Sequence, residues 1–372
     1  MESSYFDTIT SKPAFNTHCR DGRQKDFLDL NLVAASEWGR DHLFACRLIR
    51  RAPQRLVLPI LAPYTRPSDL KSSTEIISFV NGPPGPRYMA QSEHQLVRRS
   101  GCGISLGQIW AALAMFKGSR ERREKKSPPD NDDGSDEGEK RAKRPRQNTP
   151  QKDFVDSRNI RVGSSSPETE SSQEASSVAS PEDETLRLAS CVIRHILYFG
   201  APQDRTELPT VVEFRDAKVR LVAEAPISKR KIVAIDDGGL CLRKESNGGF
   251  VLSKNHLAIL EGKRQFQSFE NGRPIVSDKC LAQMTCEALV AGIDNTLYGI
   301  QPPGVIVINV TQHYMCPLHF EITSDYLNDL ESLSPTSFLY LDSTPWFDLD
   351  STYGRKQVVS NLCGLMRREL QP

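Results

Sequence analysis

The sequence lacks several features that would assign it to a class at once. Its nine cysteines are odd in number and show no C-x-x-C spacing, a pattern that suits a reducing compartment better than a disulfide scaffold. Residues 1–15 have neither a basic segment nor an apolar core, so no secretory signal peptide is expected. The longest apolar run, Ile109–Phe116, is much shorter than the roughly 20 residues that span a bilayer. No glycine-rich P-loop is present, which argues against ATP-dependent action. We therefore expect a soluble intracellular protein with no membrane segment.

The composition predicts that part of the chain is unfolded. Only 38% of the 372 residues are hydrophobic, which is low for a fully packed protein of this length. The net charge of +1 conceals basic and acidic blocks along the sequence, so it says nothing about partners. Three segments can be distinguished: an N-terminal region over 1–118, a linker over 119–181 and a domain over 182–372.

The N-terminal region has few clear patterns. Leu43–Pro63 mixes a basic helical pattern with an apolar run typical of a strand, and 74–80 predicts a short strand that ends at a Gly/Pro turn. A helix is predicted around Ile109–Phe116. The region could be an independent domain or loosely packed additional structure.

The linker consists of charged and serine-rich blocks. The basic clusters Arg120–Lys126 and Lys140–Arg146 flank a stretch that contains six acidic residues, and eight of the nineteen residues over 163–181 are serine. Such a composition buries too little apolar surface to offset the entropy lost on ordering, so we predict disorder. The two basic clusters are also typical of a bipartite nuclear-localisation signal, which predicts binding to an import receptor through Arg120 to Arg146. The alternative is a solvated run of charge.

The third segment has the patterns of a folded domain. Helices are predicted over Glu184–Gly200 and Asp278–Ile293, and the Asn247–Gly249 step predicts a hairpin between two of the strand-like runs that separate them. Further on, 304–322 predicts two strands or one long bent strand, and 324–333 and 354–370 predict helices. This order of elements indicates an α/β or α+β domain.

Two neighbouring strand-like runs carry acidic residues and a lysine at their polar positions. Residues two apart on a strand point the same way, so Glu261 and Lys263 share one face while Gly262 points to the other. If the preceding hairpin arm pairs alongside, Asp236 or Asp237 approaches Glu261, and strand alternation favours Asp237.

These side chains suit metal-assisted chemistry at a phosphodiester. Two carboxylates with water and backbone oxygens suit Mg²⁺ or Mn²⁺, which would lower the pKa of a water molecule and stabilise charge on the phosphate. Lys263 would orient that water or neutralise the developing charge. Gln283 and Glu287 are four residues apart on a predicted helix, so they share a face and could support the site by hydrogen bonds.

The sequence resembles the PD-(D/E)XK nuclease superfamily at these residues, and in particular its fungal nuclease-like proteins. The similarity rests on Ala234–Leu240, Ala258–Arg264 and Leu281–Leu289, and it extends over about half of the chain, 184–370. It implies a restriction-endonuclease-like fold, with a central mixed sheet flanked by helices and a metal site where the strands separate. That domain is preceded here by the linker and by the N-terminal region of undefined fold.

The resemblance also implies a role for each residue that matches the motifs. The metal ligands would be Glu261 with Asp237 or Asp236, the catalytic lysine would be Lys263, and Gln283 would be the helix residue that often accompanies them. Members of the superfamily often carry a further acid on the first helix, for which Glu182 and Glu184 are the candidates. The helix N-terminal dipole is an alternative reason for acids at that position.

The implied function is metal-dependent phosphodiester hydrolysis of nucleic acid in the nucleus, with DNA favoured over RNA. The alternative is a catalytically inactive protein of this fold that binds nucleic acid or protein. A third hypothesis, a serine hydrolase, comes from Ser105 in the G-x-S-x-G pattern of Gly103–Gly107. The residues His313, Cys316 and His319 are interpreted as core or edge residues and not as metal ligands, because no fourth ligand is near them in the sequence.

Overall fold

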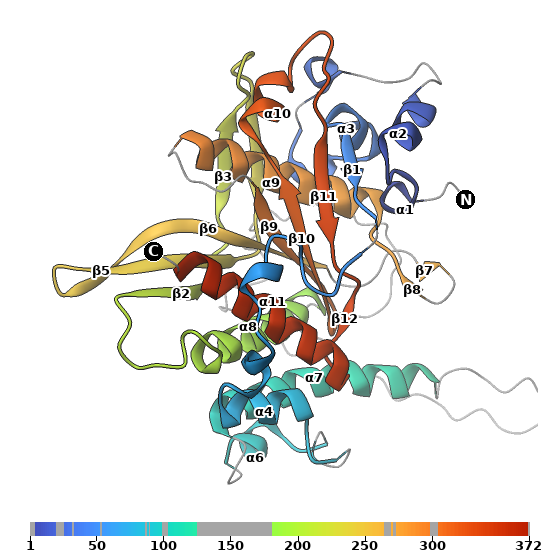
Figure 1. Ribbon diagram of the computed structural model, residues 1–372. Helices are drawn as coiled ribbons and strands as arrows, with labels where there is room; N and C mark the ends of the chain where they lie inside the picture. Colours follow the sequence, from blue (N-terminus) through green and yellow to red (C-terminus); the bar gives the residue numbers. More distant parts are fainter. Residues whose placement is uncertain are drawn as a thin grey trace, which may run out of the picture. The chain divides into compact units, whose positions relative to one another are not determined.

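An eight-stranded mixed sheet forms the centre of the computed structural model (Figure 1). Its strands lie in the order β1 (Leu48–Arg50), β11 (Leu339–Ser343), β10 (Tyr314–Glu321), β9 (Val305–Thr311), β6 (Gly249–Lys263), β5 (Gly239–Ser246) and β2 (Thr210–Arg215), with β12 (Phe347–Asp348) paired to β10. The pairs β1–β11 and β6–β9 are parallel and the others are antiparallel. A mixed sheet flanked by helices is the fold class that the sequence predicts, and this prediction is confirmed.

The structure describes residues 4–19, 26–31, 33–52, 54–85, 88, 90–98, 103–124, 181–263, 269–270, 273–297 and 304–370. The described residues up to Lys117 and from Pro181 onward belong to one compact unit. Apart from the end of helix α7 (Gly103–Glu124) and Pro181, the predicted linker and its import signal lie outside the described residues.

One face of the sheet is covered by elements from both ends of the chain. Side chains alternate along β9, so Val305 and Val307 enter this core while Ile306 and Ile308 enter the core of the opposite face. The covering elements here are α1 (Tyr5–Thr8), α2 (Lys12–Cys19), α3 (Arg40–Ala45), α9 (Asp278–Leu297), α10 (Ser324–Asp329) and the hairpin of β3 (Arg220–Glu224) and β4 (Lys231–Ile235).

The other face is covered mainly by long helices. These are α4 (Thr74–Asn81), α6 (Glu93–Arg98), the first part of α7, α8 (Pro181–Phe199) and α11 (Thr352–Leu370). Short elements complete the unit: η1 (Phe27–Asp29), η2 (Ala35–Glu37), η3 (Ala62–Tyr64), η4 (Pro67–Lys71) and the small hairpin of β7 (Phe269–Glu270) and β8 (Arg273–Pro274). No helix in the described part of the chain is long and apolar enough to cross a membrane.

Several elements agree with the sequence patterns. The predicted helices correspond to α8 and α9, and the predicted hairpin is formed by β5 and β6. At its turn Asn247 and Gly248 have φ angles of 53° and 78°, as a two-residue turn with two left-handed positions requires. The run over 304–322 forms two strands, β9 and β10, because the chain reverses at Gln312, where φ is 54°.

The strand predicted over 74–80 is wrong, because these residues form helix α4. The hydroxyl of Ser73 accepts a hydrogen bond from the N–H of Ile76 and so caps the first turn. The buried side chains Ile76, Phe79 and Val80 are three and four residues apart, which is helical spacing. The β-branched residues raise strand propensity, but the cap and the burial of one helical face outweigh it.

The N-terminal segment contributes an edge strand to the central sheet. In β1, Leu48 pairs with Leu339 of β11, and the hydroxyl of Tyr5 donates to the carbonyl of Leu48 at 2.7 Å. From the C-terminal side, Tyr326 donates to the carbonyl of Cys46 at 2.9 Å. The first hundred residues therefore share a core with the segment that carries the candidate site.

Candidate metal and phosphodiester site

The candidate site lies where β5 and β6 stop pairing. Their ladder ends with Gly239 opposite Ile259, and β6 continues while the other strand turns away toward β4. Gly238 has a φ of +134°, which strongly favours glycine, and an added Cβ would lie 2.8 Å from the carbonyl oxygen of Arg215. This turn places Asp237 beside the last residues of β6.

Asp237 completes the interrupted ladder with its side chain. Its Oδ2 accepts the N–H of Gly262 at 2.9 Å and so satisfies a backbone donor of β6 beyond the end of the β5–β6 ladder. Its Oδ1 lies 2.7 Å from the ammonium of Lys218, whose side chain is 55% exposed. Gly262 leaves room for α8, because an added Cβ would lie 2.6 Å from Leu186. The carboxylate of Asp237 therefore binds β6 through one oxygen and a half-exposed lysine through the other.

Asp236 has a different environment. Its carboxylate is fully buried and forms two bonds with the guanidinium of Arg215, at 2.6 and 3.1 Å. It also accepts the N–H groups of Val219 and Gly238 at 2.8 and 3.3 Å. The hydrogen bonds of the Asp236 carboxylate all go to Arg215 and to the backbone of the turn. The geometry therefore favours Asp237 over Asp236 as the acid of the site.

Glu261 lies on the face of β6 that packs against α9, with 1% of its surface exposed. Its Oε1 contacts the ammonium of Lys263 at 2.5 Å and accepts from the amide of Gln283 at 2.7 Å. Its Oε2 is buried and has no hydrogen-bond partner among the described residues. Burial raises the pKa of Glu261 to about 7, and the nearby Asp237 adds to this rise while Lys263 opposes it.

Lys263 shares this face with Glu261, as the strand spacing predicts. Its ammonium donates to Oε1 of Gln283 at 2.7 Å. Burial alone would lower the pKa of Lys263, but the attraction of Glu261 outweighs it and the pKa lies above its ordinary value. Lys263 is therefore a permanent cation at neutral pH.

Gln283 connects the strand residues to the helix. While its carbonyl oxygen accepts from Lys263, its NH₂ group donates to Glu261 and, at 3.1 Å, to Oε1 of Glu287. Glu287 is fully buried, and burial together with the charge of Glu261 raises its pKa well above the ordinary value. The amide orientation is fixed, because an ammonium can only donate.

Two cations near the site were not predicted from the sequence. Lys218 precedes Asp237 by 19 residues, and Arg215 precedes Asp236 by 21. No spacing rule connects these pairs across the intervening strands. Glu182, one of the two predicted helix acids, acts on Lys218 through its charge. Burial lowers the pKa of Lys218, but Asp237 and, more weakly, Glu182 and Glu261 raise it above its usual value. The negative charge of three acids thus acts on this ammonium.

In the described part of the chain no three His, Cys, Asp or Glu side chains are grouped so as to hold a metal. A cation at this site would therefore need oxygen ligands beyond Asp237 and Glu261, from the backbone, water or substrate. The run containing His313, Cys316 and His319 does not converge. His313 faces Asp348 at 3.6 Å, His319 faces Asp342 at 3.8 Å, and Cys316 is buried.

Ser105 of the G-x-S-x-G pattern has a histidine partner that the sequence did not indicate. Its hydroxyl lies 2.9 Å from Nδ1 of His195, while Nε2 of the same ring lies 3.2 Å from the carbonyl oxygen of Glu75. His195 is fully buried, and burial lowers its pKa to about 4. Such a ring is a weak base, so this pair fits a structural hydrogen bond better than an activated nucleophile.

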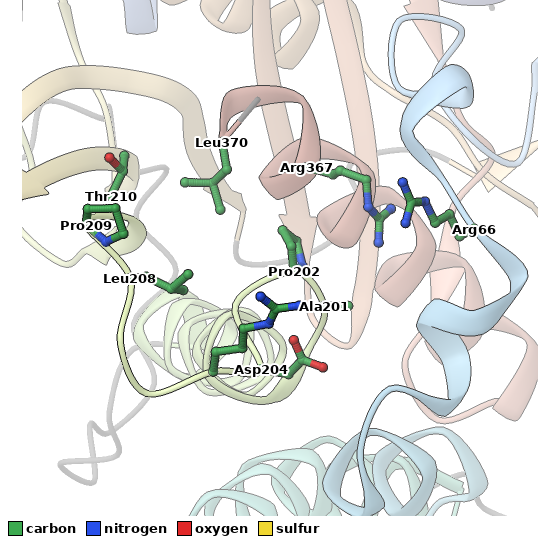
Figure 2. A pocket seen from close by; sticks show the side chains of 10 residues that line it. Arg66, Ala201, Pro202, Asp204, Leu208, Pro209, Thr210, Arg367 and Leu370 are labelled. Atoms are coloured by element: carbon green, nitrogen blue, oxygen red, sulfur yellow. The ribbon is translucent and has the colours of Figure 1, made fainter. Parts of the chain in front are cut away.

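A cavity of about 440 Å³ lies apart from these residues, between the end of α11 and the loop after α8 (Figure 2). Arg66, Asp204 and Arg367 line it together with apolar side chains such as Leu370. Arg367 is already engaged, because its guanidinium pairs with the carboxylate of Asp69. None of the candidate site residues lines this cavity.

Comparison with known proteins adds no assignment: the chain matches no protein-family model, and no curated protein matches it significantly.

Proposed function

We propose that the chain is a metal-dependent nuclease that hydrolyses phosphodiester bonds, with DNA favoured over RNA. The observation that carries this proposal is that Asp237 binds the N–H of Gly262, the residue between Glu261 and Lys263, at the end of the β5–β6 ladder, where Gln283 joins the lysine to the glutamate. The resemblance of the same segments to PD-(D/E)XK nucleases points to the same chemistry.

The donor set fits a small divalent cation. Carboxylate oxygens are the ligands that Mg²⁺ and Mn²⁺ favour, and Asp237 and Glu261 would hold the ion. The buried Oε2 of Glu261 supports this fit, because no amide, ammonium or hydroxyl group among the described residues donates to it. When bound, such an ion lowers the pKa of a water molecule and neutralises charge on the attacked phosphate.

The chain's own residues would prepare the site for that reaction. Lys263 supplies a fixed positive charge beside Glu261, where it would stabilise the charge that develops on the phosphate. Gln283 holds Lys263 and Glu261 in a fixed orientation through its hydrogen bonds. Glu287 accepts a further hydrogen bond from the NH₂ group of Gln283. Asp236 holds the turn through Arg215, which keeps Asp237 against β6.

Cleavage by the full-length chain tests the proposal. We expect cleavage of plasmid and short duplex DNA in Mg²⁺ or Mn²⁺ and none in EDTA. Either Glu261→Gln or Lys263→Met should reduce the rate roughly 100-fold or more, the typical effect of removing one group that stabilises a transition state. Glu213→Gln is the matched control, because Glu213 on β2 forms its ion pair with Arg243 on β5 and not with a candidate site residue.

Metal binding separates the two roles. By calorimetry, Glu261→Gln should lose Mn²⁺ binding while Lys263→Met retains it. Cleavage that survives both substitutions would contradict the proposal. A protein that folds but neither cleaves nucleic acid nor binds Mg²⁺ or Mn²⁺ would support the alternative, an inactive nuclear binding module. Action in the nucleus is part of the proposal and rests on the basic clusters over Arg120 to Arg146.

A further inference from the structure

The β3–β4 hairpin has one buried and one exposed face. Its inward residues, Leu221 and Ala223 on β3 and Ile232 and Ala234 on β4, belong to the core that contains α9. The outward residues alternate with them and are exposed or half-buried. In register, Arg220 lies opposite Ile235, Val222 opposite Val233 and Glu224 opposite Lys231.

The outward face combines cations with apolar side chains. Val222 and Ile235 are 41% and 54% exposed, which is unusual for large aliphatic residues on a strand. Arg220 and Lys231 are exposed, and Lys218 precedes them on the same side of the hairpin. Glu224, opposite Lys231, is the acid of this face.

This face leads directly to the candidate site. Asp237 follows the last residue of β4, Ile235, by two positions along the chain, and Lys218 pairs with that aspartate. At the site itself Asp237 and Glu261 are each paired with a lysine, Lys218 and Lys263, so little positive charge is left over for a substrate. A polyanionic substrate would therefore need further positive charge beside the site to hold its other phosphates.

We propose that the outward face of the β3–β4 hairpin binds the nucleic-acid strand next to the bond that is cut. Arg220 and Lys231 contact phosphates, and Val222 and Ile235 contact sugars or bases. The inference rests on the proposed function for its choice of partner. Beyond that function, it identifies the hairpin face as the surface that binds the substrate and as the side from which the substrate reaches Asp237.

Binding of fluorescein-labelled DNA to the full-length chain tests this surface. Anisotropy would be measured in EDTA, where no metal-dependent cleavage occurs, with single- and double-stranded DNA and a matching RNA over a series of salt concentrations. The double variant Arg220→Glu/Lys231→Glu should bind about tenfold or more weakly. It should also lower the slope of log affinity against log salt by about 2, since each phosphate contact contributes about 0.9.

Ile235→Ser should weaken binding about threefold and leave the slope unchanged, because it removes no charge. The matched control Lys356→Glu changes an exposed cation on α11, on the other face of the sheet, and should leave affinity within about twofold.

The outcomes separate this inference from the proposed function. If the wild type cleaves DNA but the double variant binds as tightly as the wild type, the hairpin surface is overturned and the face fits another partner, such as an acidic protein segment. If the double variant loses binding but the wild type never cleaves with Mg²⁺ or Mn²⁺, the surface stands and the nuclease proposal fails. If the wild type binds neither DNA nor RNA, both are overturned.

Discussion

The ammonium of Lys218 lies 2.7 Å from Oδ1 of Asp237, so it supplies one positive charge at an oxygen that a divalent cation would bind. Lys218 and a metal would compete for that oxygen, and their positive charges would repel each other. Lys218→Met should therefore raise the affinity for Mn²⁺ by about two- to fivefold, in line with the modest strength of a partly exposed ion pair.

Titration calorimetry of the full-length chain measures this effect, with Lys356→Met as the control for loss of an exposed lysine. An unchanged or weaker Mn²⁺ affinity in Lys218→Met would show that the lysine does not compete with the metal.

The adjacent aspartates should respond differently to the same isosteric change. Asp236→Asn leaves the buried guanidinium of Arg215 without its counter-charge and should cost about 3–5 kcal/mol of unfolding free energy. Asp237→Asn keeps an oxygen that can accept the N–H of Gly262, so it should change stability by less than about 1 kcal/mol while abolishing Mn²⁺ binding. Urea unfolding and calorimetry on both variants separate the roles. A stable Asp236→Asn variant that loses the metal would reverse the assignment.

The contact between Gly262 and Leu186 predicts a stability effect with a specific rescue. Gly262→Ala would bring a Cβ to 2.6 Å from Leu186 and should lower the unfolding free energy by about 1–3 kcal/mol through overpacking. Leu186→Ala in the same chain removes the obstacle, so the double variant should be less destabilised than the sum of the two single changes. Strict additivity in urea unfolding would show that α8 does not pack against this point of β6.

His195 predicts a loss of stability in mild acid. Its folded-state pKa of about 4 lies below the ordinary value of 6.5, so between these pH values the unfolded chain binds the proton and the folded chain does not. Stability therefore falls as the pH drops through this window, by about 2 kcal/mol between pH 7 and pH 5.

His195→Gln can accept from Ser105, donate to the carbonyl of Glu75 and has no charge to gain, so this part of the acid sensitivity should disappear. Urea unfolding of both proteins at the two pH values measures the difference, and equal acid sensitivity would contradict the prediction. Labelling of Ser105 by a fluorophosphonate would instead favour the serine-hydrolase hypothesis.

The sequence predicted those parts of the fold that depend on local pattern. The apolar stripe of α8, the turn at Asn247 and Gly248, and the shared face of Glu261 and Lys263 all follow from the helix or strand period. It failed at α4, where a side-chain cap decides between helix and strand. It could not predict Lys218 or β1, because their partners are brought close by the sheet and are distant along the chain.

The parallel pairing of β1 with β11 limits how the protein can be divided for experiments. A fragment that begins at α8 would keep every candidate site residue but would leave β11 as an unpaired edge and would uncover Leu339 and Leu341. Exposed apolar edge strands readily pair with other chains, so such a fragment should aggregate. Loss of nuclease activity in it would then report on solubility and not on chemistry, whereas a chain that lacks only residues between 125 and 174 would keep the sheet intact.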